Sequence, residues 1–74
     1  MINMTQDEIA KYKVKILYSN HRNEISIRNI VPIESVFKAT EYHPEEQWLL
    51  RAYDLDRQDE RHFAFNNIRA WFTD

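Results

Sequence analysis

The side chains best suited to ligand binding in this chain are arginines that lie close to aromatic or imidazole groups. Arg51 lies two residues before Tyr53, and Arg61 adjoins His62. A guanidinium group binds a phosphate through two parallel hydrogen bonds and also stacks on a nucleobase. Tyr53 and Tyr18 are the candidate stacking surfaces, because stacking of a base on an aromatic ring contributes about 1–3 kcal/mol. This combination of side chains predicts a binding cleft for phosphate and base.

The absence of glycine restricts how a phosphate is held. A chain without glycine has no glycine-rich phosphate loop. Side chains, chiefly arginine, must then supply the hydrogen-bond donors. The alternative for each arginine is an ion pair with a nearby acid, the candidates being Glu24, Glu34, Asp54 and Glu60.

Other chemistry has little support in the residue types and their spacing. There is no cysteine, which excludes disulfides and thiolate metal sites. His21, His43 and His62 match no zinc spacing, and the acidic segment 54–60 lacks the glycine of a calcium loop. The serines have no nucleophile-elbow context. We therefore expect no metal, no cofactor and no enzymatic activity.

The charge distribution is uneven along the chain. The formal net charge is −2, but residues 11–38 carry six basic and two acidic side chains, whereas residues 39–74 carry four arginines and eight acids. A protein that coats nucleic acid through phosphate contacts alone is normally basic overall. Any nucleic acid must therefore bind at a local site.

The length of 74 residues predicts a single domain, residues 1–74. A domain of this size buries only about 60% of its unfolded surface, so we expect a homo-oligomer to add stability. No segment resembles a signal peptide or approaches the roughly 20 apolar residues of a membrane span. We expect a cytoplasmic protein without membrane contact.

The hydrophobic pattern predicts one helix and then strands. Thr5 with Glu8 three positions later is a capping-box pattern, which predicts a helix within residues 1–12. From Lys13 the period changes to two, which is typical of half-buried strands. A polar turn at 20–23 contains two asparagines that tolerate positive φ, and Pro32 predicts a bend or an exposed edge. The predicted extended segments are 13–18, 24–28, 33–39, 47–53, 61–65 and 68–72.

This element order predicts a mainly β fold, with the short helix followed by a strongly bent five-stranded antiparallel barrel over residues 13–72. Strand parity places Trp48 and Leu50 on one face, and Leu49, Arg51 and Tyr53 on the other. Because so small a domain has few apolar residues to spare, we expect its apolar side chains to form the core.

The order of several short motifs resembles the WYL-domain family over roughly residues 12–72. The motifs are Ile-Leu-Tyr at 16–18, Arg-Asn-Ile-Val-Pro at 28–32, Trp-Leu-Leu at 48–50 with Ala-Tyr at 52–53, and Arg-His-Phe at 61–63 with Asn-Asn-Ile at 66–68. The resemblance implies an Sm-like barrel that binds nucleotides or single-stranded nucleic acid, in transcription regulators or near phage-defence systems. It also implies that Arg28 and Arg61 occupy positions the family uses.

The chain departs from the family pattern in three respects. Leu49 stands in place of the middle tyrosine, and Asn67 in place of an arginine. No DNA-reading helix-turn-helix accompanies the domain, which argues against a transcription factor by itself.

The sequence thus favours a ligand-binding regulatory module that senses or sequesters a nucleotide or short single-stranded nucleic acid through an arginine-aromatic cleft. The candidate site residues are Arg28, Arg51, Arg61, Tyr18, Tyr53 and His62. The alternative is a protein-interaction module that acts through an exposed sheet edge. In that case Trp71, Phe72 and Leu49 form an apolar contact patch.

Overall fold

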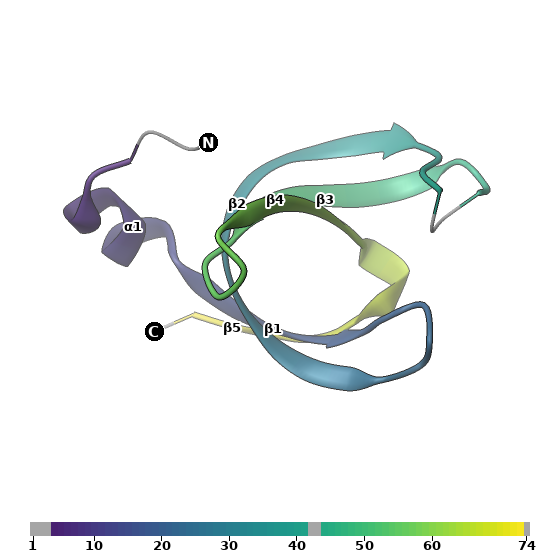
Figure 1. The fold of residues 1–74 in the computed structure, drawn as a ribbon, viewed down its shortest axis with the longest axis horizontal. Coiled ribbons are helices and arrows are strands. Elements are labelled where there is room, and N and C mark those ends of the chain that lie inside the picture. Colours follow the sequence, from purple (N-terminus) through teal and green to yellow (C-terminus); the bar gives the residue numbers. More distant parts are fainter. Residues whose placement is uncertain (1–3, 42–43, 74) are drawn as a thin grey trace.

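The computed structural model describes residues 4–41 and 44–73, and these form one α-helix, five β-strands and a short 3₁₀ helix. In chain order the elements are α1 (Gln6–Tyr12), β1 (Val14–Ser19), β2 (Ile25–Lys38), β3 (Gln47–Asp54), β4 (Asp59–Ala64), η1 (Phe65–Asn67) and β5 (Ile68–Phe72). All strands belong to one antiparallel sheet in the order β4-β3-β2-β1-β5. The sheet curls into the ring seen in Figure 1, which confirms the predicted small, strongly bent barrel.

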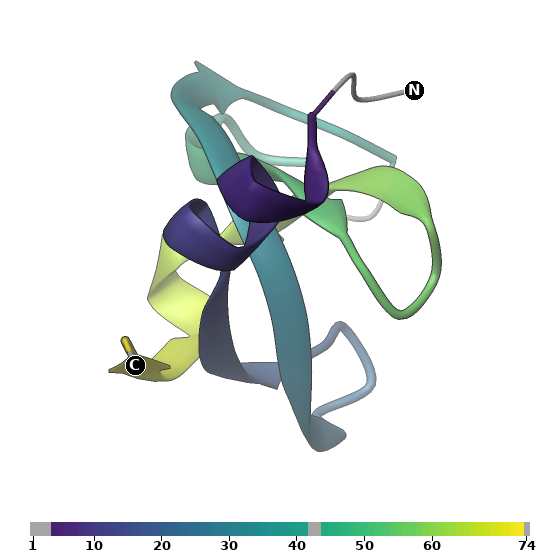
Figure 2. The ribbon, with the colours of Figure 1, turned by 90° about the vertical axis from the view of Figure 1, so that its left-hand side faces the viewer.

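Helix α1 begins at the predicted capping box. The Thr5 side chain accepts a hydrogen bond from the Glu8 backbone N–H, and the Glu8 carboxylate accepts one from the Thr5 N–H, both at 3.1 Å. This reciprocal pair satisfies two donors that the first helical turn leaves without partners. The helix packs against β2 (Figure 2). Residues 1–3 of the predicted helical segment lie outside the described residues.

The bend of the sheet comes from the length of β2. This strand pairs with β1 through Ile30 and with β3 from Ile30 onward, so its two halves belong to opposite sides of the ring. Pro32 lies in the second half, where only β3 is paired, and the register shifts between Pro32 and Glu34. A proline is tolerated there because this part of β2 has no paired strand on the side away from β3, so the missing backbone N–H breaks no hydrogen bond on that side. The predicted bend is therefore present, but the two extended segments predicted on either side of it, 24–28 and 33–39, belong to one continuous strand.

In two turns a residue other than glycine has a positive φ, the backbone conformation that usually favours glycine. Asn23 has φ 62° in the β1–β2 turn, as the asparagine-rich sequence predicts, and Asn20 Oδ1 accepts hydrogen bonds from the backbone N–H groups of Arg22 and Glu24. Gln58 has φ 55° in the β3–β4 turn, and its N–H bonds to the Asp54 carbonyl at 2.7 Å. This second turn fixes where the adjacent residues point.

The core lies inside the ring. Its main cluster consists of Ile16, Tyr18, Ile30, Leu50, Ala52 and Phe63. The expectation that the apolar side chains form the core is wrong for several of them, and Trp48 is an example, with 58% exposure. It lies near the start of β3, in the part of the β2–β3 hairpin that extends beyond the ring (Figure 1), and its ring packs edge-to-face with Phe37 at 5.5 Å between centroids.

Candidate functional site

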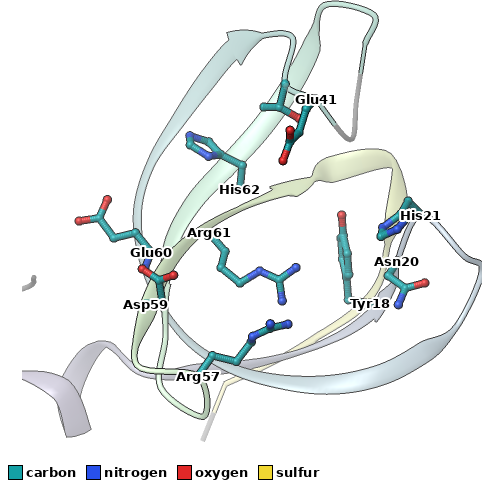
Figure 3. Close-up of a pocket in the computed structure, with 10 residues that line it drawn as sticks. Tyr18, Asn20, His21, Glu41, Arg57, Asp59, Glu60, Arg61 and His62 are labelled. Carbon is teal, nitrogen blue, oxygen red and sulfur yellow. The ribbon is translucent and has the colours of Figure 1, made fainter.

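A hollow of about 510 Å³ lies on the open side of the ring (Figure 3). Its walls come from the end of β1, the β1–β2 turn, the residues after β2, the β3–β4 turn and β4. The hollow falls within the range of about 300–1,000 Å³ that is typical of small-molecule sites. Of the predicted site residues, Tyr18, Arg61 and His62 line it.

Two guanidinium groups meet inside this hollow. Arg61 lies on β4 opposite Ala52, a core residue, so its side chain emerges on the inner face of the sheet. Arg57 extends from the β3–β4 turn, and Figure 3 shows the two guanidinium groups side by side, both directed toward Tyr18. Burial, with repulsion from Arg57 and Arg28, lowers the pKa of Arg61. Burial is the main cause of the lowered pKa, and the two neighbouring guanidinium groups add to it.

Asp54 is the buried carboxylate of this cluster. It is fully inaccessible to solvent, and its Oδ1 accepts hydrogen bonds from the backbone N–H groups of Asp56 at 3.0 Å and Arg57 at 3.2 Å. Its Oδ2 lies 3.9 Å from Arg61 Nη1, which is a charge contact but too long for a hydrogen bond.

Several polar atoms of the cluster lack hydrogen-bond partners. Among the described residues, buried side-chain atoms without a partner are Arg28 Nε, Asp54 Oδ2 and Arg61 Nη1. Buried donors of this kind are normally satisfied. Arg28 lies opposite Ile16 on the inner face of β2 and does not line the hollow, but its charge acts on Arg61. The arrangement therefore offers N–H donors and positive charge to an anion.

Tyr18 contributes its hydroxyl end to the site rather than an open ring face. The residue is only 4% exposed, and its ring packs edge-on against Phe63 with 4.9 Å between the centroids. The hydroxyl oxygen accepts a hydrogen bond from the Ala64 backbone N–H at 3.0 Å. Its own O–H proton remains able to donate.

Replacing Tyr18 by phenylalanine tests the structural part of this role. We expect Tyr18→Phe to lower the free energy of unfolding by about 1–3 kcal/mol, because the buried Ala64 N–H loses its acceptor. Urea denaturation followed by circular dichroism measures the change. A variant as stable as the parent protein would show that this hydrogen bond contributes nothing.

Arg51 and Tyr53 lie away from the hollow, on the outer face of the sheet. Arg51 Nη1 lies 2.9 Å from Glu34 Oε2, and Arg51 Nη2 lies 2.7 Å from Glu60 Oε1. These hydrogen bonds raise the pKa of Arg51. Tyr53 lines a second, smaller hollow of about 290 Å³. Arg51 thus follows the ion-pair alternative, and the structure does not bring Arg51 or Tyr53 together with Arg61.

His62 borders the main hollow from β4, but it lies in register with Arg51, so its side chain is on the outer face of the sheet, and Figure 3 shows the imidazole directed away from the two guanidinium groups. Burial lowers its pKa, and the positive charges of Lys38 and Arg51 lower it further. The lowered pKa favours the neutral imidazole at pH 7, which has one donor and one acceptor.

Arg57 is the site residue that sequence reasoning missed, because segment 54–60 reads as a solvated charged turn. The available signal is Asp54 at the first position of the turn, since aspartate at that position commonly caps the following backbone N–H groups. That cap, with the positive φ of Gln58, sets the direction of the Arg57 side chain.

The part of the chain that the structure describes contains no group of three His, Cys, Asp or Glu side chains placed to hold a metal ion. His43, one of the three histidines, lies outside this part. No helix within 4–41 and 44–73 is long and apolar enough to cross a membrane.

Comparison of the chain with protein-family models, with curated proteins and with solved structures finds no match in any of the three. The resemblance to the WYL-domain family therefore stays a prediction.

Proposed function

We propose that this domain is a non-enzymatic binding module that captures a nucleotide or a short single-stranded nucleic acid at the hollow formed around Arg57 and Arg61. The observation that carries the proposal is the pair of guanidinium groups in the hollow. Arginine donors of this kind favour phosphate oxygens because both N–H groups of the fork bond at once.

The electrostatics of the cluster support an anionic ligand. Arg28, Arg57 and Arg61 act on one another, and Asp54 is the carboxylate in contact with Arg61. An anion between the guanidinium groups removes their mutual repulsion and accepts hydrogen bonds from them.

The lining of the hollow supports binding of an anion, because its guanidinium groups supply charged hydrogen-bond donors. The cellular role that fits such a site is to sense or sequester the ligand as a regulator, in keeping with the resemblance to WYL domains.

The second candidate is a protein-interaction module, favoured by exposed aromatics on an edge strand. Trp71 and Phe72 are 43% and 46% exposed on β5, which forms one edge of the sheet. Edge strands and exposed aromatic residues recruit partner chains. Leu49 cannot belong to this patch as expected, because it is fully buried between Val36 and Ala64 in the neighbouring strands.

A thermal-shift screen of mono-, di- and cyclic nucleotides and short single-stranded oligonucleotides separates the two candidates. A ligand at one hundred times its Kd stabilises the folded state by about 2.7 kcal/mol, which raises Tm by roughly 10–20 °C in a domain of this size. We expect the rise to disappear in Arg57→Ala and to persist in Arg69→Ala, a matched control that removes an exposed arginine on β5 outside the hollow.

If no nucleotide or oligonucleotide at about 1 mM moves Tm, the nucleotide proposal fails and the protein-partner candidate leads. Recovery of the ligand unchanged after incubation with the protein distinguishes binding from turnover.

A further inference from the structure

The hollow carries opposite charges at its centre and at its rim. At the centre lie the guanidinium groups of Arg57 and Arg61 (Figure 3). At the rim lie the exposed carboxylates of Glu41 and Asp59. Glu60 also borders the hollow, but its carboxylate is paired with Arg51 and points away from the centre in Figure 3. Arg57 is itself exposed, so a ligand reaches the arginines from solvent with these two carboxylates beside it.

The hollow is closed behind the arginines. Arg61 lies in register with Ala52, and its guanidinium carbon is 5.5 Å from the centre of the Phe63 ring. Ala52, Phe63 and Ile16 are core residues with 1% exposure or less. A polynucleotide strand cannot thread past this packed core, so any strand that places an internal phosphate at the centre must enter and leave on the same side.

The charges that act on the centre of the hollow favour an anion with more than one negative charge. Arg57 and Arg61 supply two positive charges in the hollow, the charge of Arg28 acts on Arg61 from outside the lining, and the buried Asp54 supplies one negative charge. A phosphomonoester carries about −1.5 to −2 at pH 7, whereas a phosphodiester carries a single negative charge. Additional phosphates of a polyphosphate must lie beside Glu41 and Asp59, where like charges repel.

We infer that the hollow takes a terminal phosphomonoester that enters first and is followed by an uncharged nucleoside, in preference to an internal phosphodiester or a polyphosphate. The ligand class is a nucleoside monophosphate or the phosphorylated end of a short oligonucleotide. This inference rests on the proposed function, and it restricts that function to the end of a strand or to a single nucleotide.

Calorimetric titration with compounds that differ only in phosphate tests the inference. The probes are the four nucleoside 5′-monophosphates, their nucleosides, their 3′,5′-cyclic monophosphates and their 5′-diphosphates. We expect at least one monophosphate to bind about tenfold or more tightly than its cyclic and diphosphate forms. We expect no binding of the nucleosides, and loss of monophosphate binding in Arg57→Ala but not in Arg69→Ala.

A second series of titrations uses five-nucleotide single strands with a 5′-phosphate, with a 3′-phosphate or with neither. It shows whether the hollow binds the end of a strand as well as a free nucleotide. Equal affinity of phosphorylated and unphosphorylated strands, lost in Arg57→Ala, would overturn the inference while leaving the proposed function intact. If neither the monophosphates nor any of the strands bind, both fail.

Neutralising the rim tests the explanation for discrimination against polyphosphates. Glu41→Gln removes one rim charge at an exposed position. We expect this variant to bind the diphosphate several-fold more tightly while its affinity for the monophosphate changes less, because the second phosphate lies nearer the rim. An equal gain for both ligands would contradict the orientation in which the terminal phosphate enters first.

Discussion

Replacement of Asp54 by alanine is expected to lower the free energy of unfolding by about 3–5 kcal/mol, the usual effect of removing one partner from a buried charge pair. Asp54 is fully buried and does two things at once. Its Oδ1 holds the β3–β4 turn through the N–H groups of Asp56 and Arg57, and its Oδ2 is the negative charge closest to Arg61. Alanine removes both and leaves the cations of the cluster without a counter-charge.

An effect of this size is a large fraction of the stability of so small a protein. At about 0.05–0.15 kcal/mol per residue, a domain of 74 residues has roughly 4–11 kcal/mol in total. We therefore expect Asp54→Ala to be largely unfolded at 37 °C. Denaturant unfolding at 15 °C, followed by circular dichroism, measures the loss where some folded protein remains.

Asp54→Asn is the matched variant for this experiment. It keeps an oxygen at Oδ1 for the two turn N–H groups and removes only the charge, so we expect its stability to lie between those of the parent and Asp54→Ala. It also removes the carboxylate that competes with a bound phosphate for Arg61, and we expect phosphate affinity to rise. A loss below about 1 kcal/mol in Asp54→Ala would show that neither the turn nor the ion contact stabilises the fold.

The sequence contains enough information for the strands and the cap because these depend on local patterns. Alternation with a period of two predicts six extended segments that fall within the five strands or overlap them, and Thr5 with Glu8 predicts the start of α1. That β2 continues through Pro32 as one strand cannot be predicted from the local sequence. It depends on β1 and β3 pairing with different halves of the same strand, and this is a property of the assembled sheet.

The candidate site is only partly predictable for the same reason. Parity along β4 places Arg61 on the face of Phe63, which becomes the core, so an inward Arg61 follows from the sequence once Phe63 is recognised as buried. The ion pairs of Arg51 are different, because its two partners come from other strands and depend on registers that the sequence does not specify. Arg57 depends on the conformation of a turn, which is set by a buried carboxylate.

A series of substitutions at Arg61 separates its structural charge from its use in binding. Arg61→Ala removes the cation beside Asp54 and the N–H donors in the hollow, so we expect lower stability and no detectable phosphomonoester binding. Arg61→Lys keeps a positive charge near Asp54 but replaces the planar fork by a single ammonium group. We expect it to retain most of the stability of the parent protein and to bind the phosphomonoester about tenfold or more weakly.

The comparison of the lysine and alanine variants decides between two roles for the same side chain. If Arg61 serves only as the counter-ion of Asp54, lysine restores stability and any phosphate binding together, because a point charge satisfies both. If Arg61 binds phosphate through two N–H groups, lysine restores the stability of the fold but not the affinity for phosphate. Denaturant unfolding and calorimetric titration of the two variants measure these quantities separately, and a lysine variant that binds as tightly as the parent would exclude recognition by the guanidinium fork.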